Sequence, residues 1–156
     1  MTGENSQVLL TKEGYKKLQD ELNHREGELR KKLQETLNQM RKQGDLREND
    51  GYSIAVEDFQ NNEERITTLK ETLEKAQVVT KKKSTKVEIG SFVTIECKKG
   101  VHTTYIIVGE HEANPVESKI SYKSPIGSSL MGKTKGSKIV IDTPSGKTEC
   151  TIISVR

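Results

Sequence analysis

Apolar residues in the first half of the chain recur at the spacing of one helix face. Between Tyr15 and Met40 they follow one another at steps of three, four or seven residues, close to a heptad repeat. Residues 12–43 contain no proline, so this pattern predicts a helix of about 32 residues, roughly 48 Å long. Thr11 can cap the helix, although Gly14 stands where a full capping box would have a glutamate. The apolar positions are Tyr15, Leu18, Leu22, Leu29, Leu33, Leu37 and Met40.

A second apolar seam follows a short polar segment. Residues 44–51 begin and end with glycine and carry acidic and amide side chains, which is typical of a helix stop and a turn. Two helices with such thin apolar stripes can bury them only against each other, so we expect an antiparallel, coiled-coil hairpin over residues 1–79. Polar breaks near Glu26 and Asn62 are expected to thin the interface and to fix its register. The second seam consists of Tyr52, Val56, Phe59, Ile66, Leu69, Leu73 and Ala76.

The period changes after residue 79. Residues 80–86 have no apolar side chain and four lysines, which indicates a linker. Residues 87–156 contain short runs rich in Val, Ile, Thr and Tyr, separated by Gly, Pro, Asn and Lys, which predicts a small, mostly antiparallel β domain with one helical turn near 126–131. The fold class is therefore α+β. The expected strands are 92–96, 103–108, 119–122, 138–142 and 149–155.

Composition and charge exclude several classes of function. Residues 1–80 hold 13 basic and 16 acidic side chains, a net of −3, and residues 81–156 hold 13 and 7, a net of +6. Neither half is basic enough for tight duplex binding alone, the lysine run is most simply a solvated segment, and 4% aromatic residues leave little for base stacking. No apolar run is long enough for a membrane span and the N-terminus has no signal pattern, so we expect a cytoplasmic protein.

The cysteines and histidines suggest no site of their own. Cys97 and Cys150 are expected to be small apolar strand residues with free thiols, although a disulfide between them stays open. Neither the cysteines nor the three histidines have the spacing of a zinc site. No serine has an evident base partner for nucleophilic catalysis.

The acidic residues at the hairpin tip are the best candidates for chemistry. Asp45 and Glu48 are three residues apart, so a helical or turn-like tip could aim both carboxylates the same way. The structural alternative is that acids are common in turns, and Asp50 could cap the second helix. Spacing alone favours this alternative.

Residues 44–49 of the tip read Gly-Asp-Leu-Arg-Glu-Asn, and Tyr52 follows. This sequence resembles the Gly-Asp-Leu-x-Glu-Asn core of the tip of the Gre factors, a family of bacterial transcription elongation factors that promote transcript cleavage. The likeness covers nearly the whole chain. Further matching segments are 10–18, 76–79, 105–109, 112–114, 120–121, 124–126, 132–133 and 143–146.

The resemblance implies an FKBP-like second domain and a mechanism. The β domain would dock on bacterial RNA polymerase, with DNA present in that complex, and the tip would enter the secondary channel. Asp45 and Glu48 would help to hold an Mg²⁺ ion shared with the polymerase active centre, and the polymerase itself would hydrolyse its backtracked RNA. The protein would be a monomer that binds no metal tightly when free. Arg41 and Arg47 would face the nascent RNA 3′ segment, and the residues implied to dock on the polymerase are Glu112, Asn114, Ser124 and Pro125.

Three departures from the Gre sequence pattern keep a second hypothesis open. Gre tips commonly continue Asn-Ala-Glu-Tyr, whereas this chain has Asp50 and Gly51 between Asn49 and Tyr52, and Val56 replaces a basic residue. A Gre-like protein that occupies the channel without promoting cleavage is therefore the main alternative. A prolyl isomerase is a third candidate, but two Phe and no Trp provide little for its aromatic pocket.

Overall fold

The computed structural model describes residues 7–44 and 48–156. The chain divides into two compact units, one formed by residues 16–75 and the other by residues 76–156 together with residues 7–15. Within the described residues, no helix has both the length and the apolar character that crossing a membrane requires.

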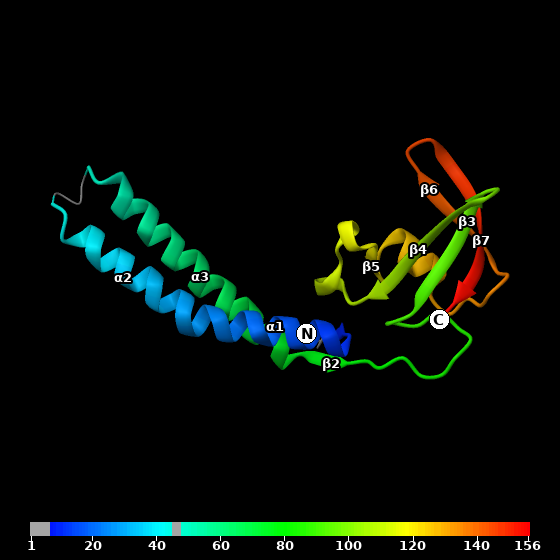
Figure 1. Ribbon diagram of the computed structural model, residues 1–156, viewed down its shortest axis with the longest axis horizontal. Helices are drawn as coiled ribbons and strands as arrows, with labels where there is room; N and C mark the ends of the chain where they lie inside the picture. Colours follow the sequence, from blue (N-terminus) through cyan, green and yellow to red (C-terminus); the bar gives the residue numbers. More distant parts are fainter. Residues whose placement is uncertain (1–6, 45–47) are drawn as a thin grey trace, which may run out of the picture. The chain divides into compact units, whose positions relative to one another are not determined.

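The first unit is a helical hairpin, as predicted. Helix α1 (Lys12–His24), a π-helical turn η1 (Arg25–Leu29) and α2 (Arg30–Arg41) follow one another without a break. Helix α3 (Asp50–Glu74) returns beside α2 (Figure 1). The predicted first helix ends two residues early, at Arg41.

The apolar seam of the hairpin is thin, which also matches the prediction. Its fully buried apolar side chains are few, and α2, described over its whole length, has none. Near the tip, Tyr52, Val56 and Phe59 are only half-buried. The buried apolar residues of this unit are Leu18, Leu22, Ala55, Ile66 and Leu69.

Polar contacts across the hairpin lie where the seam is interrupted. Asn62 is buried, and its amide donates to the Arg25 carbonyl at 3.2 Å and accepts from the Arg25 guanidinium at 3.1 Å. Arg25 and Arg65 both donate to Glu21, and these hydrogen bonds lower the pKa of Glu21 from 4.5 to about 2. A bidentate Arg30–Glu63 pair lies further towards the tip. Asn49 meets Met40 at the tip whereas Arg65 meets Glu21 far from it, so the helices are antiparallel.

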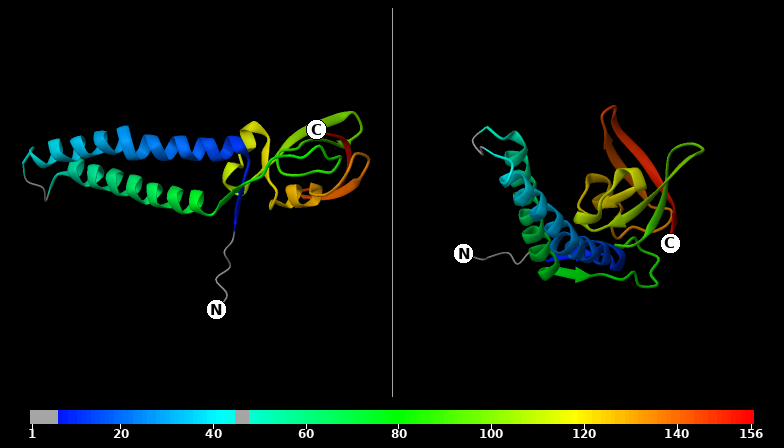
Figure 2. Two further views of the ribbon diagram at one scale, coloured as in Figure 1. Left: turned by 90° about the horizontal axis from the view of Figure 1, so that it is seen from below. Right: turned by 60° about the vertical axis from the view of Figure 1, so that its left-hand side comes forward.

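The second unit contains a five-stranded sheet in the order β5-β4-β3-β7-β6. All neighbouring strands are antiparallel except β4 and β5, which are parallel. Every strand and the helical turn expected in residues 87–156 is present, and the curl of the sheet is visible in Figure 2. The elements are β3 (Phe92–Lys98), β4 (Val101–Val108), β5 (Lys119–Ser121), α4 (Pro125–Leu130), β6 (Lys138–Thr143) and β7 (Gly146–Val155), with short 3₁₀ turns η2 (Glu110–Glu112) and η3 (Pro115–Glu117).

One face of this sheet carries the apolar core. Alternate residues of β3, such as Val93 and Ile95, are fully buried, while Phe92, the first residue of this strand, is 47% exposed. Helix α4 contacts β5 and β6, and its Leu130 is completely buried. The core consists of Val87, Val93, Ile95, Ile107, Leu130, Ile139, Ile141, Cys150 and Ile152.

Two short strands were not predicted. β1 (Val8–Leu10) and β2 (Ala76–Val78) form a separate parallel pair. Three-residue strands are too short for a periodicity to identify them, and Ala76 was expected to continue the helical seam. Their pairing joins the segments before α1 and after α3 inside the second unit.

The cysteines differ from the expectation of free thiols. Cys97 and Cys150 form a disulfide between β3 and β7, with their Cα atoms 4.0 Å apart. These strands are direct neighbours in the sheet, so two residues separated by 53 positions lie opposite each other. The sequence contains both cysteines but does not show which strands pair.

Candidate functional site

The base of the hairpin tip is held by Asn49. Its side chain accepts a hydrogen bond from the Tyr52 amide at 3.2 Å, so Asn49, and not Asp50, caps α3. The same side chain donates to the Met40 carbonyl near the end of α2 at 3.4 Å. One residue therefore caps the second helix and ties it to the first.

The charged residues of the tip project from this base. Glu48 directly precedes the cap, is exposed and forms no ion pair with any described residue. Asp50 is the exposed first residue of α3, where a negative charge is favourable next to the helix N-terminus. Arg41 is exposed at the last position of α2. Asp45 and Arg47 lie outside the described residues.

The positions that depart from the Gre pattern have specific surroundings. A Cβ atom at Gly51 would lie 3.2 Å from the Asn49 side-chain oxygen and 3.3 Å from the Met40 sulfur, so glycine leaves room at the base of the tip. Val56 is half-buried beside the seam, between Tyr52 and Phe59. It is neither a core residue nor a freely exposed one.

Metal binding by the described residues alone is not supported. No three of their His, Cys, Asp or Glu side chains lie together as a metal site would require. The metal ligands predicted at the tip include Asp45, which lies outside the described residues. Glu48, the other predicted ligand, is described and exposed.

Three of the four residues predicted to dock on the polymerase shape turns of the β unit. Asn114 accepts from the Val116 amide at 3.1 Å and caps η3, and Val116 is 94% exposed. Ser124 caps α4 by accepting from the Gly127 amide at 3.0 Å, and Pro125 is the first residue of that helix. These residues therefore have local structural roles, and whether they also dock stays a prediction.

Glu112, the fourth, is turned towards the start of α1. Its carboxylate accepts a hydrogen bond from the Thr11 amide at 2.8 Å and another from the Thr11 hydroxyl. The sequence interpretation missed this role. The missing glutamate at Gly14 was the one local indication that a partner for Thr11 had to come from elsewhere.

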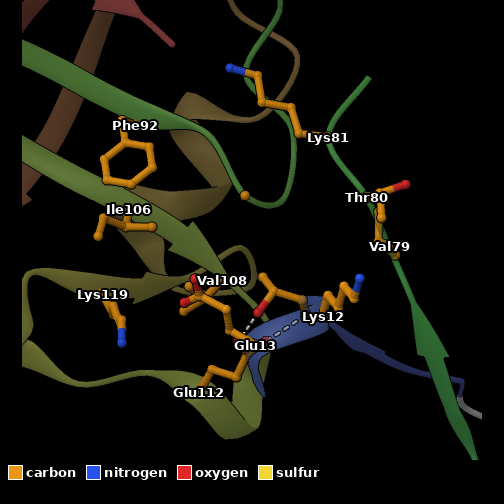
Figure 3. Close-up of a pocket in the computed structure, with 12 residues that line it drawn as sticks. Lys12, Glu13, Val79, Thr80, Lys81, Phe92, Ile106, Val108, Glu112 and Lys119 are labelled. Atoms are coloured by element: carbon orange, nitrogen blue, oxygen red, sulfur yellow. Dashed lines mark hydrogen bonds between the residues drawn. The ribbon is translucent and has the colours of Figure 1, made fainter. Parts of the chain in front are cut away.

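A pocket of about 280 Å³ opens beside Glu112 (Figure 3). Its apolar lining includes Phe92, Ile106 and Val108, and Lys12 and Lys81 are among its charged residues. Phe92 is the one aromatic residue in the described lining. This composition gives no support to the prolyl isomerase hypothesis, which needs an aromatic pocket.

Comparison with known protein families decides which family the chain belongs to. A model described as "Transcription elongation factor, N-terminal" matches residues 8–78, and one described as "Transcription elongation factor, GreA/GreB, C-term" matches residues 81–156. The chain belongs to the GreA/GreB family of transcription elongation factors. The resemblance found in the sequence is thereby confirmed, and the helical hairpin and five-stranded sheet confirm the α+β fold class.

Individual relatives of this GreA/GreB family member match over nearly their whole length. The transcription elongation factor GreA of Bacillus cytotoxicus is 41% identical over 150 residues, covering 94% of this chain and 95% of the relative. GreA of Amoebophilus asiaticus is 40% identical over 148 residues, covering 93% and 94%. Among solved structures, GreA factor homolog 1 (Gfh1) of Thermus thermophilus is 28% identical, covers 96% of this chain and 99% of that one, and has a TM-score of 0.45.

Proposed function

We propose that this protein binds bacterial RNA polymerase, inserts its hairpin tip into the secondary channel and stimulates the hydrolysis of backtracked RNA by the polymerase. It acts as a factor that completes an active centre belonging to its partner, and not as an autonomous enzyme. The observation that carries the proposal is an exposed carboxylate, Glu48, immediately before the capped start of α3 at the end of a two-helix hairpin.

The geometry at the tip suits presentation of a carboxylate to a partner. Asn49 caps α3 and is bonded to Met40, so the residue preceding it is attached to a fixed backbone. Glu48 has no ion pair with a described residue that would have to break first. A catalytic group that is held in position contributes to the rate through its orientation as well as through its charge.

The chemistry of the tip fits a shared Mg²⁺ ion. Mg²⁺ prefers oxygen ligands, keeps several waters and is commonly bound by one or two carboxylates together with phosphate. Glu48 and, by the resemblance, Asp45 would hold it, and a bound Mg²⁺ would supply positive charge to the attacking or leaving oxygen of the phosphodiester. Their share of the site is too small to bind the ion tightly in the free protein.

Other residues of the chain would attach the protein to the RNA and to the polymerase. Arg41, exposed at the end of α2, is available to a phosphate of the RNA 3′ segment, and Arg47 is assigned the same role from its position in the tip. Residues 81–156 carry a net charge of +6, which suits docking on an acidic rim of the polymerase because complementary charge raises the association rate.

The test is RNA cleavage in stalled, backtracked elongation complexes with Glu48→Gln and Asp45→Asn. Each substitution keeps the size of the side chain but removes the negative charge that a hard cation needs, so we expect cleavage to fall on the order of 10²-fold. Asp50→Asn is the matched control, because it removes an exposed acid from the same turn. Competition for polymerase should be unchanged in all three.

Two outcomes would contradict the proposal. Near-normal cleavage by both Glu48→Gln and Asp45→Asn would reject the metal-site role. Wild-type protein that competes for polymerase but stimulates no cleavage would instead support the channel-occupying alternative, which the departures at Asp50, Gly51 and Val56 keep in play.

A further inference from the structure

Helix α1 begins with half of a capping box. Thr11 is its N-cap, and the Thr11 hydroxyl accepts a hydrogen bond from the Gly14 amide at 3.0 Å. In a complete box, a Glu or Gln at position 14 would accept from the Thr11 amide in return. Glycine cannot do this, so the local sequence leaves the Thr11 amide without its usual partner.

Glu112 supplies the missing half from 101 residues away. One carboxylate oxygen accepts from the Thr11 amide at 2.8 Å and from the Gly109 amide at 3.3 Å, and the other accepts from the Thr11 hydroxyl. Figure 3 shows the Glu112 side chain reaching the first turn of α1, with dashed lines for its hydrogen bonds. Thr11 therefore bonds to its own helix and to the β unit at once.

Two glycines make room for this contact. A Cβ atom at Gly14 would lie 2.0 Å from the carboxyl carbon of Glu112, and one at Gly109 would lie 2.0 Å from the Leu9 carbonyl oxygen. Gly14 lies within a regular helix, where alanine is the better helix former, so its backbone does not require glycine. Glycine is required at position 14 because the Glu112 carboxylate occupies the space that a Cβ atom would need.

The first turn of α1 belongs to the compact unit of the β sheet, whereas α1 continues from residue 16 into the hairpin unit. The continuous helical segment Lys12–Arg41 is roughly 45 Å long at about 1.5 Å per residue. A tilt of about 5° at its start would displace its far end by about 4 Å over that length. Displacements of about 1 Å are enough to impair a positioned catalytic group by about 10²-fold.

We propose that Glu112 is a positioning residue for stimulated cleavage, because it completes the capping box of α1 and holds the first turn of the hairpin's leading helix to the β unit. The inference rests on the proposed function and replaces the direct docking role that the family resemblance implied for this residue. Glu112 contacts neither RNA nor metal in this role.

The first experiment separates positioning from docking. Glu112→Ala and Glu112→Gln are titrated into backtracked elongation complexes, and the half-saturating concentration and the maximal cleavage rate are fitted separately. We expect Glu112→Ala to lower the maximal rate about tenfold while the half-saturating concentration stays within about threefold. Glu112→Gln keeps an acceptor for the Thr11 amide, so it should retain most of the maximal rate.

Glu110→Gln is the matched control, because Glu110 lies in the same turn but pairs with Lys123 at the surface. It should change neither quantity. A raised half-saturating concentration with an unchanged maximal rate for Glu112→Ala would overturn the proposal in favour of docking. No effect on either quantity would overturn it outright.

A second experiment tests the steric argument. Gly14→Ala should reduce the maximal rate in the wild-type background, because its methyl group would displace the Glu112 side chain. In the Glu112→Ala background the same substitution should cause no further loss, since the side chain it would strike is gone. Equal losses in both backgrounds would contradict the proposed contact.

A third measurement does not depend on cleavage. Spin labels carried by noncanonical amino acids at the exposed Lys31 and Lys147 positions report the distance distribution between α2 and the β6–β7 turn of the full-length protein, with the disulfide intact. Glu112→Ala should broaden this distribution, and Glu110→Gln should not. An unchanged width would overturn the positioning role, whereas failure of wild-type protein to stimulate cleavage would count against the proposed function alone.

Discussion

The two units of this protein are stabilised in different ways. In the β unit, nine buried residues form one continuous core, and a disulfide joins two neighbouring strands. In the hairpin, few apolar residues are buried, and directional contacts around Asn62 cross between the helices. Apolar packing tolerates small shifts between its partners, whereas hydrogen-bonded pairs specify which residue lies opposite which. Under the proposed function the hairpin presents a tip side chain, and a specified register fixes where that side chain lies.

Reduction of the Cys97–Cys150 disulfide should have the largest effect and should act on the β unit only. The bond closes a sequence separation of 53 residues, and such cross-links typically stabilise a fold by about 2–4 kcal/mol. Hydrogen exchange read by mass spectrometry, with and without reductant, would report the two units separately. The Cys97→Ser/Cys150→Ser double variant should not respond to reductant, and faster exchange of the hairpin upon reduction would contradict this division.

Asn62→Ala should destabilise the hairpin by about 1–3 kcal/mol, because it removes a buried amide together with its two hydrogen bonds to Arg25 across the helices. The neighbouring Asn61 is exposed, so Asn61→Ala is the matched control and should be close to neutral. Exchange rates in the β unit should not change. Equal effects of the two substitutions would show that the buried amide does not specify the hairpin.

Acid should weaken the hairpin through Glu21. The Arg65 and Arg25 hydrogen bonds hold the pKa of Glu21 at about 2, below its ordinary value of 4.5. The stabilisation is therefore complete above pH 4.5 and is lost as the pH falls towards 2. Because the side chain is 30% exposed, solvent screening limits this contribution to about 1–2 kcal/mol.

Circular dichroism melting at several pH values, comparing wild type with Glu21→Gln, would measure this contribution. The wild-type advantage should shrink between pH 4.5 and pH 2. Glu28→Gln is the control, because Glu28 is 85% exposed. A wild-type advantage that stayed constant down to pH 2 would exclude Glu21 as the titrating group.

The smallest expected effect is a gain in stability. Gly27 lies in the exposed π-helical turn, and an added Cβ would meet nothing within 4 Å. Gly27→Ala should therefore stabilise the hairpin by about 0.5–1 kcal/mol, through the lower conformational freedom of alanine in the unfolded chain. The measurement is the midpoint of thermal unfolding. A loss of stability would show that the π-helical turn itself requires glycine.

The sequence by itself determined the secondary-structure elements and the family. The steps of three, four and seven between Tyr15 and Met40 and between Tyr52 and Leu73 predicted both helices, and runs rich in Val, Ile and Thr predicted every strand of the five-stranded sheet. These patterns arise within a few residues, because backbone geometry fixes which neighbours share a face. The tip motif at residues 44–49 led to the family in the same way, from contiguous residues.

Only the tertiary structure decided which distant residues meet. It pairs β1 with β2, joins Cys97 to Cys150, places Asn62 opposite Arg25, and brings Glu112 to Thr11. In each case the local sequence shows one partner at most, such as a threonine whose capping box lacks its glutamate. The identity of the other partner depends on the path of the whole backbone, because contacts across 37 to 101 residues follow from how the chain packs and not from any local period.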